Sequence, residues 1–169
     1  MGCLEVANKG YGFNYKYNFN EFREFNWSKV LPSDLGEYKI PDGLEDWQKA
    51  CYVGATAGYV YREQHGNIDF NSIEDYEIMG YLLAALGVCF EKMHGLPKDS
   101  IRSLEDYNGY VMFFLCVTWP PKEYNETLAT LTQDSFLKKI NEFLSKLCCK
   151  EKTRNFYNAL EMCEEYIKW

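Results

Sequence analysis

At 169 residues the chain fits one domain that can bury a sizeable core. Its composition, 47% hydrophobic and 25% charged, is that of a folded globule and excludes a wholly disordered chain. The net charge of −7 argues against nucleic-acid binding, because the basic residues gather only in residues 138–154 and the rest of the chain repels phosphate. The charge therefore favours a cationic partner.

The cysteines and the apolar segments indicate a reduced, aqueous compartment. Seven cysteines, an odd number without CxxC spacing, suit free thiols better than a disulfide framework. The longest apolar run, residues 110–119, is too short to cross a bilayer, and no secretion signal is visible. We therefore expect a cytoplasmic protein without a membrane partner.

The first 43 residues differ in pattern from the remainder. In residues 11–19 an aromatic residue stands at every second position: Tyr11, Phe13, Tyr15, Tyr17 and Phe19. This period of two is typical of a half-buried strand, and turn-forming residues follow at 31–36 and 40–43. We predict an irregular or short β-hairpin aromatic arm over residues 1–43, packed on a helical domain of residues 44–169.

The remainder of the chain has the apolar spacing of helices. We predict helices over residues 44–65, 73–94, 104–119, 122–131, 135–149 and 153–169. Gly66 and Gly95 stand where a left-handed C-terminal cap belongs, and the prolines at 120 and 121 end the third helix. The predicted fold class is therefore mainly α: a single-domain helical bundle of about six helices with the aromatic N-terminal arm.

Three short stretches share the order Leu or Ile, Glu-Asp and an aromatic residue: "LEDW" at 44–47, "IEDY" at 73–76 and "LEDY" at 104–107. Ser72 and Ser103 precede two of them as candidate N-caps, each with an aspartate three residues on at the capping-box spacing. The other follows a turn, with Asp42 or Gly43 as its candidate cap. We interpret the stretches as helix starts. A degenerate duplication, in which a shift of 29 residues aligns two helices, stays open.

Small residues form a row on each of the first two predicted helices. The rows are Ala50, Gly54 and Gly58 on one helix and Gly80, Ala84 and Gly87 on the other. Because glycine within a helix costs about 1 kcal/mol relative to alanine, the rows indicate a compensating contact. An antiparallel hairpin would place Gly58 against Gly80, Gly54 against Ala84 and Ala50 near Gly87. We therefore predict an unusually close helix pair.

No catalytic or metal-binding signature is complete in the sequence. The two histidines cannot complete a di-iron carboxylate site, and no recurring ligand spacing points to zinc. We therefore predict no cofactor and no metal. Cys148 and Cys149 lie among lysines that would lower a thiol pKa, so a small cysteine-dependent enzyme or redox-sensing protein is the alternative function.

Carboxylates interleaved with aromatic residues carry the functional hypothesis. Tyr and Trp are preferred interface anchors, and carboxylates around them select basic partners. The predicted partner-binding residues are Glu45, Asp46, Trp47, Glu74, Asp75, Tyr76, Glu77, Glu105, Asp106 and Tyr107.

These properties predict a non-catalytic, acidic protein-binding or inhibitor module. Its profile, which is small, acidic, tyrosine-rich and helical, is similar to that of bacterial immunity proteins, which neutralise cationic toxins such as nucleases. The likeness is one of physical profile, and no shared motif carries it. The expected mechanism is occlusion of a basic active site by acidic and tyrosine side chains. A homo-oligomer that hides the aromatic surfaces is a further alternative.

Overall fold

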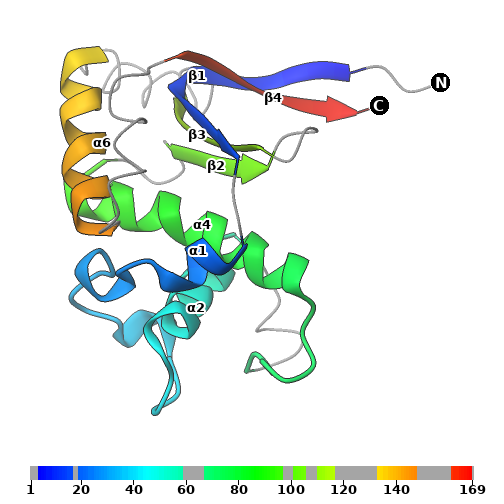
Figure 1. Ribbon diagram of the computed structural model, residues 1–169, viewed down its shortest axis with the longest axis vertical. Coiled ribbons are helices and arrows are strands. Elements are labelled where there is room, and N and C mark those ends of the chain that lie inside the picture. Colours follow the sequence, from blue (N-terminus) through cyan, green and yellow to red (C-terminus); the bar gives the residue numbers. More distant parts are fainter. Residues whose placement is uncertain are drawn as a thin grey trace.

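The long helix α4 lies between a four-stranded sheet and the smaller helices α1 and α2 (Figure 1). The computed structural model describes residues 4–16, 19–58, 67–96, 101–105, 110–116, 133–147 and 161–168. The helices are α1 (Phe19–Glu24), α2 (Asp46–Gly58), α4 (Asp75–His94) and α6 (Gln133–Leu147), with short 3-10 turns η1 (Trp27–Lys29) and η2 (Gly36–Tyr38). The strands are β1 (Leu4–Lys16), β2 (Ile101–Glu105), β3 (Tyr110–Cys116) and β4 (Glu161–Lys168).

The sheet is antiparallel and has the order β2-β3-β1-β4. Strand β1 is interior: Tyr11 pairs with Leu115 of β3 on one side and with Met162 of β4 on the other. The first part of the alternating aromatic segment, up to Lys16, lies in a strand as predicted, whereas Phe19 begins helix α1. Strand β1 is not a hairpin arm, however, because both of its partners come from distant parts of the chain.

Two predicted helices are therefore corrected. Residues 104–119 and 153–169 were expected to be helical, but their described parts contain the end of strand β2 and the whole of strands β3 and β4. A short apolar run such as Tyr110–Cys116 fits a buried strand as well as a helix, and its pairing with β1 decides the outcome. Such pairing spans about a hundred residues of sequence, so no local pattern reveals it.

The prediction of a mainly helical chain is confirmed in its coarse form, since helices predominate between residues 19 and 96 and again in α6. The described residues contain four α-helices rather than six. The helix predicted over residues 122–131, and the predicted cap Gly66, lie outside the described residues. The boundary between an arm and a domain at residue 43 stays a prediction.

The ends of α4 agree with the prediction at one terminus only. Gly95 caps the C-terminus in the left-handed conformation (φ 63°), and the N–H of Leu96 donates to the Glu91 carbonyl at 2.9 Å. At the other end Ser72 is not the N-cap, because the helix begins at Asp75 and Ser72 belongs to a turn closed on the carbonyl of Asp69.

The caps predicted for the other two stretches are also wrong. Ser103 lies inside strand β2. Helix α2 begins at Asp46, later than predicted, and the Glu45 N–H donates to Gln48 Oε1 at 2.8 Å. This bond is half of a capping box, with Glu45 in the cap position in place of Asp42 or Gly43. Acidic residues do occupy the first turns of α2 and α4, where the helix dipole favours them.

Trp27 anchors the N-terminal segment in the core. Its side chain is fully buried, and the indole N–H donates to the Phe22 carbonyl at 2.7 Å. The adjacent Asn26 N–H donates to the carbonyl of Leu147, the last residue of α6, at 2.8 Å. One buried cluster joins this segment to α2, α4 and α6, and it includes Phe22, Val30, Tyr52, Leu82, Phe90, Ile140 and Phe143.

Helices α2 and α4 approach most closely at Gly54. A Cβ added to Gly54 would overlap the main-chain carbonyl of Tyr81 and would lie 3.1 Å from the nitrogen of Ala85. Ala50 and Ala85, the small residues beside this contact, are fully buried. The predicted close helix pair is confirmed at this point, because only hydrogen at position 54 allows the two backbones to meet.

The predicted register of the two rows is wrong at the other glycines. Nothing lies within 4 Å of a Cβ added to Gly80, which is exposed and therefore does not face α2. Gly87 faces Ile101 of β2, whose carbonyl would be 3.4 Å from an added Cβ. The two glycines of α4 thus differ in their surroundings. Gly87 packs against β2, and no described residue packs against Gly80.

Substitutions of Gly54 and Gly80, one glycine in contact with another helix and one exposed, allow a matched test of this packing. Gly54→Ala should lower the free energy of unfolding by about 1–3 kcal/mol, because the new methyl group meets main-chain atoms that cannot move independently. Gly80→Ala should raise it by about 0.5–1 kcal/mol, because alanine has the higher helix propensity and open space surrounds it. Urea unfolding monitored by circular dichroism measures both changes. Equal effects of the two substitutions would contradict the close contact at Gly54.

Candidate functional site

The first predicted acidic stretch, at the start of α2, is mostly engaged within the molecule. The Trp47 ring packs edge-on against Phe70 with the ring centroids 5.4 Å apart, and its indole N–H donates to Glu45 Oε2 at 2.9 Å. The Arg23 guanidinium lies over the same ring at 4.7 Å. Asp46 is 3.8 Å from Lys49 Nζ. Trp47 is therefore half-buried, and its ring packs against the core.

The second stretch, at the start of α4, faces solvent. Tyr76 is 75% exposed, and the adjoining Glu74 and Asp75 are exposed as well. The charge of Glu77 raises the pKa of the Tyr76 phenol, and burial, a hydrogen bond to Glu77 and the charge of Glu74 act in the same direction. The phenol therefore keeps its proton at neutral pH and remains a hydrogen-bond donor.

The third stretch is only partly described. Glu105 ends strand β2, where its backbone pairs with Val111 of β3. Asp106 and Tyr107 lie outside the described residues.

The loop that leads into the second stretch contacts the helix that carries the first. Trp47 contacts Phe70, and the Ile68 N–H donates to the Tyr52 hydroxyl at 3.0 Å, so the loop of residues 67–74 is fixed to α2. The same loop leads directly into α4. Residues 44–58 and 67–77 together contain six carboxylates and one lysine: Glu45, Asp46, Asp69, Glu74, Asp75 and Glu77, with Lys49. We call these six carboxylates with Tyr76 the acidic surface.

A row of solvent-accessible residues continues from Tyr76 along α4. Gly80, Ala84 and Val88 follow it at intervals of four residues, which places all four on one face of the helix. Gly80 is exposed, and Ala84 and Val88 are half-buried. The sequence prediction missed this row, because it assigned Gly80 and Ala84 to the contact with α2. The only signal in the sequence was the spacing of four from Tyr76.

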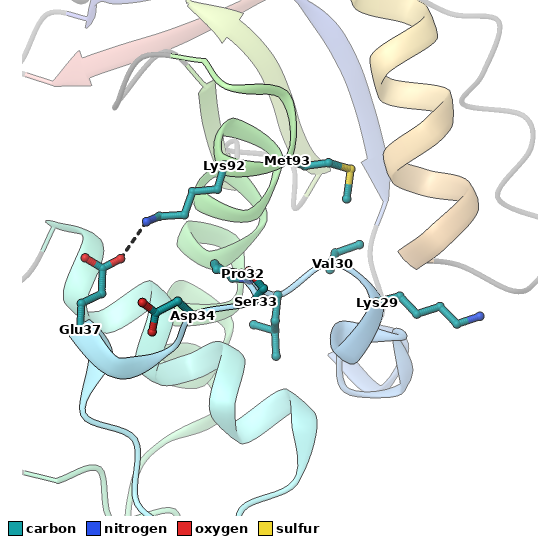
Figure 2. Close-up of a pocket in the computed structure, with 9 residues that line it drawn as sticks. Lys29, Val30, Pro32, Ser33, Asp34, Glu37, Lys92 and Met93 are labelled. Carbon is teal, nitrogen blue, oxygen red and sulfur yellow. Dashed lines mark hydrogen bonds and ion pairs between the residues drawn. The ribbon is translucent and has the colours of Figure 1, made fainter.

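A separate groove of about 610 Å³ lies between the C-terminal end of α4 and the segment of residues 29–37 (Figure 2). Lys92 crosses one side of it and binds Glu37 at 2.7 Å, as the dashed line in Figure 2 shows. The hydrogen bond to Lys92 lowers the pKa of Glu37, and the same bond raises the pKa of Lys92. Both shifts favour the charged forms at neutral pH, so the pair ties η2 to α4 and is not poised to transfer a proton.

Two of the cysteines, Cys51 in α2 and Cys89 in α4, are shielded from solvent and from reagents. Cys51 and Cys89 are fully buried in the core. Burial raises the pKa of the Cys89 thiol to about 12 and raises that of Cys51 as well. Cys148 and Cys149, the candidates for a reactive thiol, lie outside the described residues.

No group of three or more His, Cys, Asp or Glu side chains in the described ranges is placed to hold a metal ion. Among the helices that the structure describes, none is long and apolar enough to cross a membrane.

Comparison with protein-family models, with curated proteins and with solved structures finds no match for this chain. Its function is therefore inferred from the chemistry of its own surface.

Thiol alkylation tests the burial of the two core cysteines. In the folded protein near neutral pH, iodoacetamide should leave Cys51 and Cys89 unmodified, because the reagent attacks an accessible thiolate and neither condition is met. Both should react after unfolding in urea. Mass spectrometry of proteolytic fragments reads each site separately. Modification of Cys51 or Cys89 in the folded state, at a rate close to that of free cysteine, would contradict the described core.

Proposed function

We propose that the protein is a non-catalytic protein-binding or inhibitor module, and that its partner is a basic protein that docks on the acidic surface. In the more specific form of this proposal it acts as an immunity protein. It would then neutralise a cationic toxin, such as a nuclease, by covering a basic active site. The observation that carries the proposal is Tyr76, a large aromatic side chain that is 75% exposed among carboxylates.

Tyr76 has the properties of an interface anchor. Tyrosine is enriched among the residues that dominate binding energy, because it supplies a large contact area with few rotatable bonds. Its backbone lies in the first turn of α4, a helix that is itself packed in the core. The phenol keeps its proton and is hydrogen-bonded to Glu77, so the ring offers a partner its apolar faces beside a carboxylate.

The carboxylates around Tyr76 supply the preference for a basic partner. Glu74, Asp75 and Glu77 lie within one turn of it, and no lysine or arginine stands in residues 67–77. Such a surface attracts cations over long range and raises the association rate, more so at low ionic strength. Two copies of this chain pairing symmetrically through the surface would bring like charges together, so the proposal favours a different, basic protein over a homo-oligomer.

The row along α4 allows a partner to come close. Gly80 presents open backbone, and the neighbouring Ala84 adds only a methyl group. Glycine at an exposed helical position costs about 1 kcal/mol relative to alanine, and no contact among the described residues offsets that cost. A partner that packed against Gly80 beside the Tyr76 ring would offset it in the complex.

Comparative capture tests the proposal. Immobilised wild-type protein, incubated with lysate of its source cells at low salt, should retain a protein of net positive charge. Tyr76→Ala should lose most of that protein, because the substitution removes the aromatic anchor but leaves the charges in place. The control is Glu142→Gln, which removes an exposed carboxylate from α6, a different helix. Quantitative mass spectrometry compares the three samples.

The purified pair then gives the affinity. Tyr76→Ala should weaken binding about tenfold or more, and Glu74→Gln with Glu77→Gln should weaken it and flatten its dependence on salt concentration. Glu142→Gln should match the wild type. A partner that is acidic, or a partner whose affinity is unchanged by all substitutions on α4, would contradict the proposed site.

A further inference from the structure

An apolar stripe and hydrogen bonds to two main-chain carbonyls are among the contacts that join helix α6 to the rest of the described molecule. The stripe consists of Ile140, Phe143, Leu144 and Leu147, all buried. One hydrogen bond comes from the Asn26 N–H to the Leu147 carbonyl, which would otherwise lack a partner within the helix. The other joins His94, the last residue of α4, to the carbonyl of Lys139 at 3.1 Å.

The position of His94 fixes its tautomer. A carbonyl oxygen can only accept a hydrogen bond, so Nε2 must carry the proton and donate to Lys139, and Nδ1 is the nitrogen that titrates. The imidazole also packs on the Phe90 ring with the centroids 4.7 Å apart, and Phe90 meets Phe143 of α6 edge-on at 5.4 Å. The histidine is thus built into the joint between the two helices.

The charges around the joint oppose a second proton on His94. Lys139 and Lys146 face it from α6, and Glu142 is the carboxylate that opposes them. Glu142 already pairs with Lys146 at 3.6 Å, so Lys146 partly offsets the attraction of Glu142 for a protonated His94. On α4, Lys92 is bound to Glu37, and Glu91 accepts a hydrogen bond from the Ile101 N–H at 2.9 Å. An imidazolium here would be half-buried and would repel both lysines of α6.

We infer that the joint between His94 and α6 is proton-sensitive, and that protonation of Nδ1 loosens α6 from α4 while leaving the contact between α2 and α4 intact. Burial first, and then the charge of Lys139, lower the pKa of His94, and the charge of Glu142 and the hydrogen bond to the Lys139 carbonyl only partly offset these effects. Because the folded-state pKa lies below the unfolded one, the stabilisation by neutral His94 is complete above the unfolded pKa. It is lost as the pH falls through the folded pKa.

The extent of the effect is bounded. The four buried side chains of α6 keep it docked in most molecules, so protonation raises a minor undocked population and does not release the helix completely. A single proton is taken up, so the equilibrium constant for local opening can rise by at most about tenfold per pH unit. The apolar stripe of α6 is the surface that opening exposes.

Amide hydrogen exchange of the full chain tests the inference. Exchange is measured at about pH 7.5 and about pH 5, on either side of the ordinary histidine pKa, and is corrected for the intrinsic pH dependence of amide exchange. The opening constant of α6 amides should rise several-fold at the lower pH, and that of amides in α2 should change less. His94→Gln keeps a side-chain N–H donor but cannot be protonated, so it should abolish the difference between α6 and α2.

Two controls make the result decisive. His65→Gln removes the other histidine and should leave the pH response of α6 unchanged. An NMR titration of the wild type reads the His94 pKa directly, and it stands even if His94→Gln fails to fold. A pKa at or above the ordinary value, a pH response that survives His94→Gln, or an equal response in every helix would each overturn the inference.

Discussion

The contact between the backbones of α2 and α4 at Gly54 is the constraint on which the rest of the described structure depends. A single methyl group at this position would overlap the Tyr81 carbonyl, so the distance between the two helices is set by the absence of a side chain. The close approach lets Ala50 and Ala85 bury fully beside it. It also fixes the rotation of α4 about its own axis, because the residues that face α2 are determined by this contact.

The rotation of α4 decides what each of its other faces does. Gly87 turns toward Ile101 and brings β2 against the helix, while Phe90 and His94 meet α6. These contacts bury the helix nearly all round. The remaining accessible face, before the last turn, is the row that begins at Tyr76 and passes through Gly80. The exposure of Tyr76 is therefore a consequence of the way α4 is packed in the core.

The sequence was informative where the determinants of structure are local. The apolar spacing of 75–94, the left-handed cap at Gly95 and the small residue Gly54 all act within a few turns of chain, and these features were predicted. Strands β3 and β4 were mistaken for helices, because each pairs with β1, which is distant from both in sequence. Ser72 failed as a cap because its turn closes on Asp69.

The candidate site, too, could be predicted from the sequence only where its determinants are local. The acidic first turns could be predicted from the sequence, but the difference in solvent exposure between Trp47 and Tyr76 could not. Both rings follow a Glu-Asp pair, and only tertiary contacts separate them: Phe70 and Arg23 cover Trp47, whereas nothing comparable covers Tyr76. The register of the glycine rows depended on how α4 is rotated, and that depends on three neighbours at once.

The close approach of the two helices can be observed directly by NMR. An isotope-labelled sample should show strong nuclear Overhauser effects from the α-protons of Gly54 to the amide proton of Ala85 and to main-chain protons near the Tyr81 carbonyl, because these backbones are in van der Waals contact. The same experiment should show no such effects from Gly80 to protons of α2. Effects from Gly80 to α2 in place of those from Gly54 would mean that α4 is rotated differently. The assignment of Tyr76 to the accessible face would then fail.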